Sequence, residues 1–115
     1  MTHFEFLRTL VHSVREVGAA ATLDAVRTER PRFDRGNYHH TRAVFYVWAV
    51  SRLVDAGLSD MGILWHPLVD DQSPLAWWHV GVLESAEAHE TFIPSTEALP
   101  GEPQPTELAE VALAV

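Results

Sequence analysis

Cysteine is absent from this chain of 115 residues, and so is any long apolar run. Without cysteine there are no disulfides, iron–sulfur clusters or thiol nucleophiles, so the fold must be stabilised by its core alone. The longest apolar run has eight residues, 43–50, whereas a membrane-spanning helix needs about 20. The N-terminus carries Glu5 early and lacks a small-residue cleavage site, which is unlike a signal peptide. We therefore expect a soluble cytoplasmic protein with no membrane partner.

Positive charge is confined to the first half of the chain, and lysine is missing altogether. All eight basic residues are arginines that lie at or before Arg52. Residues 1–54 carry a net charge of +3, whereas residues 55–115 carry −11. Because non-specific binding to phosphates requires clustered positive charge, we expect neither nucleic acid nor anionic membrane as a partner. Four arginines between residues 27 and 35 are expected to form a solvated loop that pairs with the acidic half, although they could serve an anionic ligand.

The spacing of apolar residues predicts helices from the start of the chain. Residues 3–17 have apolar side chains at helical spacing, with Thr2 as a suitable N-cap and Gly18 as a plausible end. Residues 19–30 predict a second helix, which Pro31 would stop. The sequence contains no Asn-Gly hairpin signal and no sustained alternation of apolar and polar residues, so it does not predict strands.

The third predicted helix, at about residues 37–56, is the most apolar part of the chain. Between residues 43 and 50 it is apolar on nearly every side, which is typical of a central helix that packs on several sides. Residues 59–65, 74–80 and 84–91 predict shorter helices. The fold class we predict is therefore all-α, a small helical domain built around one long buried central helix.

The end of the chain differs from the rest. We expect a single helical domain over residues 1–93 and a proline-rich acidic tail over residues 94–115. Within the tail, residues 106–115 carry apolar side chains at helical spacing, but ten residues alone would not hold a helix in water. We expect this segment to dock on the core or on a neighbouring subunit. A homo-oligomer is expected, because so small a chain has little room to cover its central helix alone.

The first turns of the central helix carry the best candidates for chemistry. On a helix His39, Arg42 and Tyr46 share one face. A histidine transfers protons near neutral pH, and a neighbouring arginine can hold a carboxylate while lowering the histidine pKa. We expect these residues, with His12 from the first helix, to form the polar floor of a helical pocket. The alternative is that they are half-exposed residues at a helix end, hydrogen-bonded to nearby loops.

Aromatic residues form a second candidate set. Four tryptophans in so small a domain could line an apolar pocket for a flat ligand, and we expect Trp48, Trp77 and Trp78 as its walls. The alternative is that they are the core of a small protein that needs large side chains. The remaining candidates for ligand binding are Tyr38, His40 and His79.

Seven histidines require that metal binding be considered. No two of them have the i, i+4 spacing of the H-E-x-x-H motif, and a closed zinc site is disfavoured without cysteine. We therefore expect no cofactor, and keep as an alternative an open iron or zinc site built from His12, His39 and His66 with a carboxylate. His3 and His89 are interpreted as solvent residues. The dispersed glycines match neither a phosphate-binding loop nor a dinucleotide motif.

Several short segments form a recognisable pattern. They are Tyr38-His39-His40-Thr41, Ser73-Pro74-Leu75, Trp77-Trp78-His79, Leu83-Glu84-Ser85-Ala86-Glu87-Ala88, Phe92-Ile93-Pro94 and Leu99-Pro100. The pattern resembles an uncharacterised family of small bacterial proteins, which has a Tyr-His-Glu-Thr motif at the start of a helix. A Leu-Pro-Leu segment, an aromatic pair followed by Ser, a Ser-x-x-Ala helix and a Phe-Val-x-Pro ending complete the family pattern.

The resemblance implies a shared fold and a shared site around His39, but no reaction, because the family has no established activity. Two positions depart from the pattern: His40 replaces the glutamate of the first motif, and His79 replaces the serine after the aromatic pair. If the family uses that glutamate as a base or metal ligand, this chain has altered the site.

Together these features predict a small cofactor-free enzyme that acts on a small organic acid or an aromatic metabolite. His39 would be the general acid and base and Arg42 the anion clamp, for an isomerisation, elimination or cyclisation. Two alternatives remain: the metal-binding protein described above, and a non-catalytic interaction module that uses the acidic half and residues 106–115.

Overall fold

Helices are the regular elements of the computed structural model, which describes residues 2–29, 33 and 38–93. In chain order they are α1 (His3–Thr28), α3 (His40–Asp55), α4 (Asp60–Leu64), the 3₁₀ turns η1 (Pro67–Val69) and η2 (Ser73–Ala76), α5 (Val80–Leu83) and α6 (Ala86–Glu90). The described residues form no strand. The prediction of an all-α protein is confirmed. The proline-rich tail lies outside the described residues, as does most of the arginine cluster between residues 27 and 35.

Helix α1 is two helices joined at a glycine. The Thr2 hydroxyl accepts the N–H of Glu5 at 3.1 Å and so caps the first turn, as the sequence predicted. Gly18 has φ 88° and ψ 170°, a conformation that a residue without Cβ adopts at little cost, and it separates the two predicted segments. The buried hydroxyls of Ser13 and Thr22 hydrogen-bond at 2.7 Å and brace the two halves across this kink.

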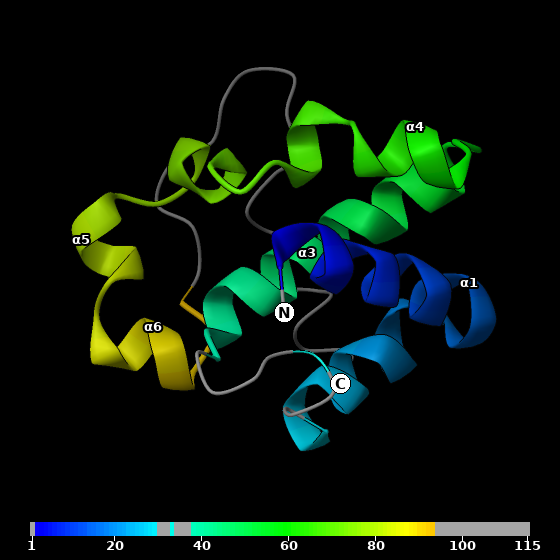
Figure 1. Ribbon diagram of the computed structural model, residues 1–115. Helices are drawn as coiled ribbons and strands as arrows, with labels where there is room; N and C mark the ends of the chain where they lie inside the picture. Colours follow the sequence, from blue (N-terminus) through cyan, green and yellow to red (C-terminus); the bar gives the residue numbers. More distant parts are fainter. Residues whose placement is uncertain (1, 30–32, 34–37, 94–115) are drawn as a thin grey trace.

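Helix α3 is the buried centre of the structure. In Figure 1 it runs behind α1, and these two helices pack extensively against each other. Phe45, Val47 and Val50 are completely buried, which confirms the expected central helix. The helix begins three residues later than predicted, at His40, because His39 acts as its N-cap.

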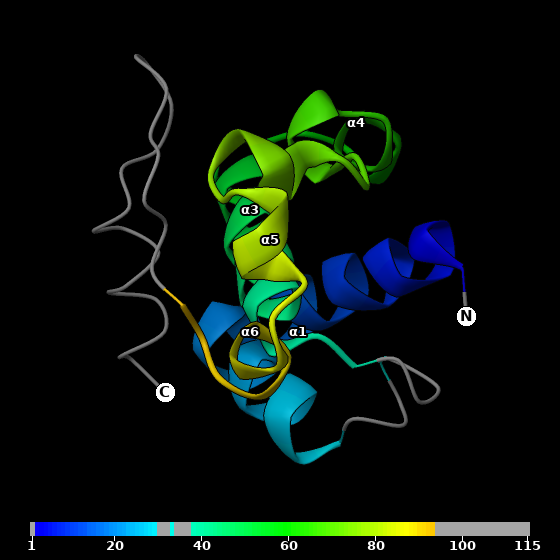
Figure 2. The same ribbon diagram turned by 90° about the vertical axis from the view of Figure 1, so that its left-hand side faces the viewer.

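The short helices cover the remaining sides of α3. Figure 2 shows α5 in front of α3 and α4 beyond its far end. The predicted helix over residues 59–65 is observed as α4, and the predicted helix over 84–91 is observed as the shorter α6. Instead of one helix over residues 74–80, the chain forms the turn η2 and then begins the separate helix α5. None of the helices among the described residues is both long and apolar enough to cross a bilayer.

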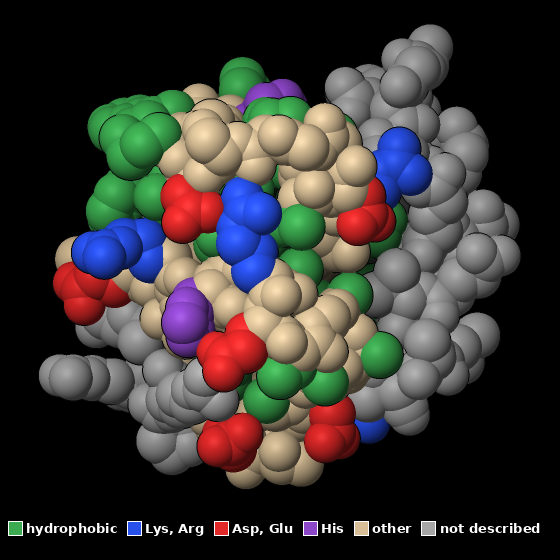
Figure 3. All heavy atoms as spheres, turned by 90° about the vertical axis from the view of Figure 1, so that its right-hand side faces the viewer, with side chains coloured by type: hydrophobic (Ala, Val, Ile, Leu, Met, Phe, Trp, Pro, Cys, Tyr) green, Lys and Arg blue, Asp and Glu red, His purple; other side chains and the backbone are tan. Residues whose placement is uncertain are grey.

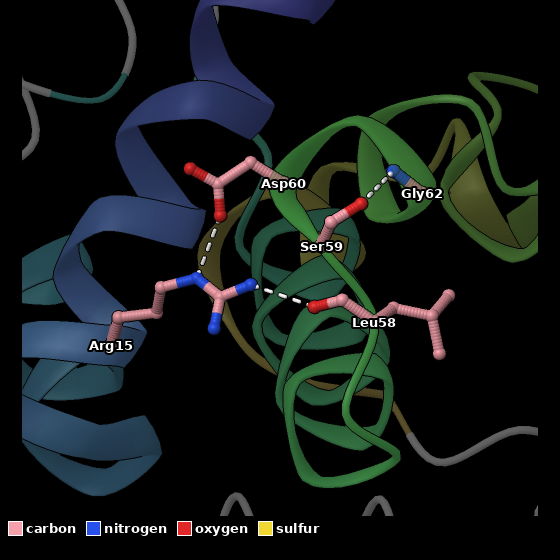
Figure 4. A network of polar contacts seen from close by, with 5 residues as sticks. All are labelled: Arg15, Leu58, Ser59, Asp60 and Gly62. Carbon is pink, nitrogen blue, oxygen red and sulfur yellow. Dashed lines mark hydrogen bonds and ion pairs between the residues drawn. The ribbon is translucent and has the colours of Figure 1, made fainter.

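Two polar links hold the outer segments to the long helices. The Thr41 hydroxyl, at the start of α3, donates to the carbonyl oxygens of Ala88 and Thr91, each at 2.9 Å. On the other side, Arg15 of α1 donates to the Asp60 carboxylate at 2.7 Å and to the Leu58 carbonyl at 2.8 Å (Figure 4). These links position α6 and α4, whose few residues would not hold a helix by themselves.

Candidate functional site

A cleft of about 260 Å³ lies where α1 and α3 both begin. We call it the N-terminal cleft; its lining includes His3, Phe6, Tyr38, His39, Arg42 and Tyr46. Two helix starts come together there because the apolar faces of α1 and α3 pack along their lengths. Four residues of the predicted site line the cleft. They are His39, Arg42 and Tyr46, which were predicted to share one helix face, and Tyr38.

Arg42 supplies the positive charge of the cleft. Its guanidinium Nη1 donates to the backbone carbonyl of Asp71 at 3.2 Å. Within the described ranges, Arg42 forms no ion pair with a carboxylate. Asp71 also lines the cleft, with an exposed side chain at its mouth. A guanidinium with unused donors can hold a carboxylate or phosphate group in two parallel hydrogen bonds.

Tyr46 is buried and tied to the backbone. Its hydroxyl donates to the Asp70 carbonyl at 2.7 Å. Burial is the main reason that the pKa of Tyr46 lies well above its ordinary value, and the nearby Asp71 and Asp70 carboxylates raise it further against the opposing effect of Arg42. The phenol therefore stays protonated at neutral pH. Its role in the cleft is to hold the loop at residues 70–71 in place and not to exchange protons.

Both ring nitrogens of His39 are occupied. Nδ1 accepts the N–H of Arg42 at 3.2 Å, so the proton is on Nε2, which donates to the Leu83 carbonyl. Burial is the main cause that lowers the pKa of His39; the bond to Leu83 opposes it, and the neighbouring His89 and Arg42 lower it further. His39 therefore caps α3 and links it to the end of α5. It can accept a proton only if its bond to the Arg42 N–H breaks.

His3 lies in the same cleft and was not among the residues predicted for it. The interpretation of His3 as a solvent residue is wrong: its ring is half-buried and packs edge-on against Tyr46, with 4.9 Å between the ring centroids. Nε2 lies 2.8 Å from the Val69 carbonyl and must donate to it, which leaves the lone pair on Nδ1 without a partner among the described residues. One signal in the sequence pointed to the cleft, because His3 shares its helix face with Phe6, Leu7 and Leu10.

His89 was also interpreted as a solvent residue, and this too is wrong. Its ring packs against that of His39, with centroids 4.2 Å apart. Its Nδ1 donates to the Ser85 carbonyl at 2.8 Å. The contact explains why His89 disfavours the charged form of His39, since two imidazolium rings at this distance would repel each other.

His12 does not join the cleft, contrary to the prediction. Its side chain is 75% exposed and pairs with Glu16 at 2.9 Å. The reason is helical geometry: His12 lies nine residues after His3, which places it about 180° around α1. It borders a different groove, between α1 and α4.

The tryptophans are core residues, and the prediction that they wall the pocket is wrong. Trp48, Trp77 and Trp78 are at most 2% exposed, and none lines the N-terminal cleft. Trp48 and Trp77 pack edge to face with 5.9 Å between centroids, and the Trp78 indole N–H donates to the Ile93 carbonyl at 2.8 Å. They contribute hydrophobic burial on the side of α3 that faces away from the cleft.

The other two candidates for ligand binding also lie outside the cleft lining. His40 is buried, and its Nδ1 is hydrogen-bonded to the Tyr38 hydroxyl. His79 is exposed at the start of α5. Tyr38 is thus the one member of the predicted ligand-binding set that borders the cleft.

The three histidines proposed for a metal site lie apart. His66 caps η1, where its Nδ1 accepts the N–H of Leu68 at 3.0 Å, while His12 and His39 make the contacts described above. Over residues 2–29, 33 and 38–93, no three His, Asp or Glu side chains come together in an arrangement that could hold a metal ion.

The fold and the cleft define a small all-helical protein with an aromatic-lined cavity that contains Arg42, at the start of its two long helices. No family model, curated protein or solved structure matches this chain. The resemblance to the bacterial family with the Tyr-His-Glu-Thr motif therefore stays a prediction, and any function has to be inferred from the geometry of the cleft.

Proposed function

We propose that the N-terminal cleft binds a small organic acid, with the Arg42 guanidinium holding its carboxylate. The observation that supports this proposal is that the Arg42 guanidinium has hydrogen-bond donors that no carboxylate of the described residues uses. The Arg42 side chain is half-buried and donates to a backbone carbonyl. A charge-assisted hydrogen bond to an anion would therefore satisfy the guanidinium.

The rest of the lining supports a small ligand with an apolar part. Phe6 and the rings of Tyr38 and Tyr46 border the cleft, and aromatic surfaces pack well against flat or apolar groups. The volume of about 260 Å³ is at the lower limit of ligand pockets, which are commonly about 300 Å³ or more, and therefore favours a metabolite of few atoms. Asp71 at the mouth favours a ligand that also carries a hydrogen-bond donor.

The proposed chemistry is proton transfer without a cofactor, with His3 in the role first expected of His39. The lone pair of His3 Nδ1 would take a proton from an activated C–H bond of the bound acid. The same nitrogen, now protonated, would return the proton to another atom of the ligand. Such a transfer is an isomerisation. His39 remains the group that fixes the backbone N–H and therefore the position of Arg42.

Binding is tested first, with benzoate and pyruvate as probes and two-dimensional NMR as the readout. Both should shift the amide signals of α1 and α3 around the cleft. Arg42→Gln should weaken binding about ten- to hundredfold, the equivalent of roughly 1.5–3 kcal/mol for a hydrogen bond to a charged group. Arg27→Gln, at an exposed position in the last turn of α1, is the matched control and should leave the affinity unchanged. Equal affinities in both variants would contradict the proposal.

Proton transfer is tested separately, by exchange of the pyruvate methyl protons in deuterium oxide. The wild type should accelerate the exchange, and His3→Gln should remove the acceleration while pyruvate still binds. His12→Gln changes an exposed histidine of the same helix and should exchange like the wild type. If His3→Gln exchanges as fast as the wild type, His3 is not the base.

A further inference from the structure

The structure leaves large apolar side chains exposed where the start of α1 meets α4. Trp65 is 73% exposed, Met61 59% and Phe4 41%. The rings of Phe4 and Trp65 lie side by side, with 6.3 Å between centroids. We call Phe4, Met61, Leu64 and Trp65 the α1–α4 patch. Contiguous apolar surface of this kind marks interaction sites more often than it occurs by chance on a monomer.

A groove adjoins the patch. It has a volume of about 850 Å³ and runs between one face of α1, which carries Phe4, Arg8, Val11 and Arg15, and the α4 residues Met61 and Leu64. Figure 3 shows the apolar side chains gathered at one edge of this side of the molecule, next to arginine side chains. Its lining is mixed, with four apolar residues and six polar or charged ones. A helix-lined groove that combines apolar and charged positions suits an amphipathic helix.

The two walls of the groove are held together. Arg15 of α1 bonds to the carboxylate of Asp60 and to the Leu58 carbonyl, and the Ser59 hydroxyl caps α4 by accepting the Gly62 N–H at 3.1 Å (Figure 4). A groove whose walls are already fixed loses little conformational freedom when it binds a partner. The surface is therefore suited to capture a short segment.

Charge narrows the choice of partner. Arg8 is exposed at the groove, and no ion pair involves it in the part of the chain that the structure describes. Arg15 is already paired with Asp60. Two carboxylates, those of Glu5 and Asp60, also line the groove, so its charge is balanced overall and Arg8 is the cation left for a partner. A partner with an apolar stripe and one carboxylate placed at Arg8 would cover the patch and also pair with Arg8.

The chain itself contains such a segment. In residues 106–115, Leu108, Val111, Ala112 and Val115 have the i, i+3, i+4, i+7 spacing of one helix face, and Glu107 falls on one flank of that face. The described part ends at Ile93. The twelve residues 94–105 can span up to about 40 Å when extended, at about 3.3 Å per residue. That reach is comparable to the 34 Å longest dimension of the structure, so the linker is long enough for the segment to approach faces distant from Ile93.

We propose that residues 106–115 dock in cis as a short helix on the α1–α4 patch, with the apolar side chains of one face over Trp65 and Glu107 toward Arg8. The docking face supplies the burial that ten residues need in order to form a helix. The segment thereby covers the exposed apolar surface of its own chain. This inference does not depend on the function proposed for the N-terminal cleft.

Trp65 provides the readout, because the other three tryptophans are buried. The full-length protein is titrated with acrylamide, a neutral quencher of tryptophan fluorescence, and Trp65→Phe identifies the signal of Trp65. In the wild type Trp65 should be protected. Leu108→Asp should raise the quenching slope of Trp65 several-fold. Leu113→Asp places the same charge about 140° away around the helix and should behave like the wild type.

Two results would overturn the proposal. If Trp65 is quenched equally in the wild type and in Leu108→Asp, the segment does not cover the patch. If Trp65 is protected only at high protein concentration, together with a doubled mass in light scattering, a second copy of the chain covers the patch and the docking is not in cis.

Discussion

The two sides of the N-terminal cleft use their histidines differently. At the start of α3, His39 bonds to a backbone N–H with one nitrogen and to a backbone carbonyl with the other. At the start of α1, His3 bonds to a carbonyl with one nitrogen, and the lone pair of the other has no partner in the part of the chain that the structure describes. Both side chains border the same cavity, yet of the two only His3 can accept a proton without breaking a structural bond. A polar residue at the start of a buried helix can therefore be fully engaged in hydrogen bonds that hold the fold, and it is then not free to take part in proton transfer.

Removal of His39 should have the largest effect on stability. His39→Ala loses the N-cap of α3 and the link to Leu83, and we expect a loss of about 2 kcal/mol in the free energy of unfolding, about 1 kcal/mol from each bond. His3→Ala loses one hydrogen bond on a half-buried side chain and should cost about half as much. Urea denaturation of both variants measures the difference. A cost for His3→Ala that equals or exceeds that for His39→Ala would contradict the structural role of His39.

The lowered pKa of His39 predicts that the free energy of unfolding depends on pH, with a smaller effect than the loss of the side chain in His39→Ala. The unfolded chain binds the His39 proton near the ordinary pKa of about 6.5, whereas the folded protein binds it only at lower pH. The contribution of His39 to stability is therefore complete above about pH 6.5 and is lost as the pH falls toward its folded pKa. Part of the lowering of the His39 pKa comes from His89, whose ring faces that of His39.

The urea midpoint between pH 7.5 and pH 5.5 measures this dependence. The midpoint of the wild type should fall on acidification, and that of His39→Gln should fall less over the same range. His12→Gln, at an exposed position, should follow the wild type. If the midpoint of His39→Gln falls as much as that of the wild type, the pKa of His39 is not lowered by folding.

Much of the fold could be predicted from the sequence because its signals are local. The apolar residues of α3 occur on all sides of a long helical segment, which is possible only for a central helix, and Gly18 interrupts α1 where a positive φ is needed. Apart from the start of α3, the predicted boundaries differed most from the structure after Trp65, where η2 and α5 replace one predicted helix. There, helices and turns of three to five residues are held by capping side chains and tertiary contacts, and no periodic pattern is long enough to reveal them.

The site could be predicted only in part, because helix geometry is local and cleft formation is not. The repeat of a single helix predicted a shared face for His39, Arg42 and Tyr46, and all three line one cleft, although His39 precedes the first helical residue. The contribution of His3 depends on how α1 packs against α3. That of Asp71 depends on a loop held by the bond between Tyr46 and the Asp70 carbonyl, 24 residues apart. Neither relation is visible in residue spacing.

The most direct test of the roles of the two histidines is long-range proton–nitrogen NMR of their rings, recorded with and without benzoate. We predict that His39 is a neutral ring protonated on Nε2, with a pKa below its ordinary value, and that benzoate leaves both its nitrogens bonded. We also predict that benzoate shifts Nδ1 of His3, and that Arg42→Gln abolishes this shift. If benzoate instead changes the bonding of the His39 nitrogens and leaves His3 untouched, His39 is the working base and the roles assigned to the two histidines are wrong.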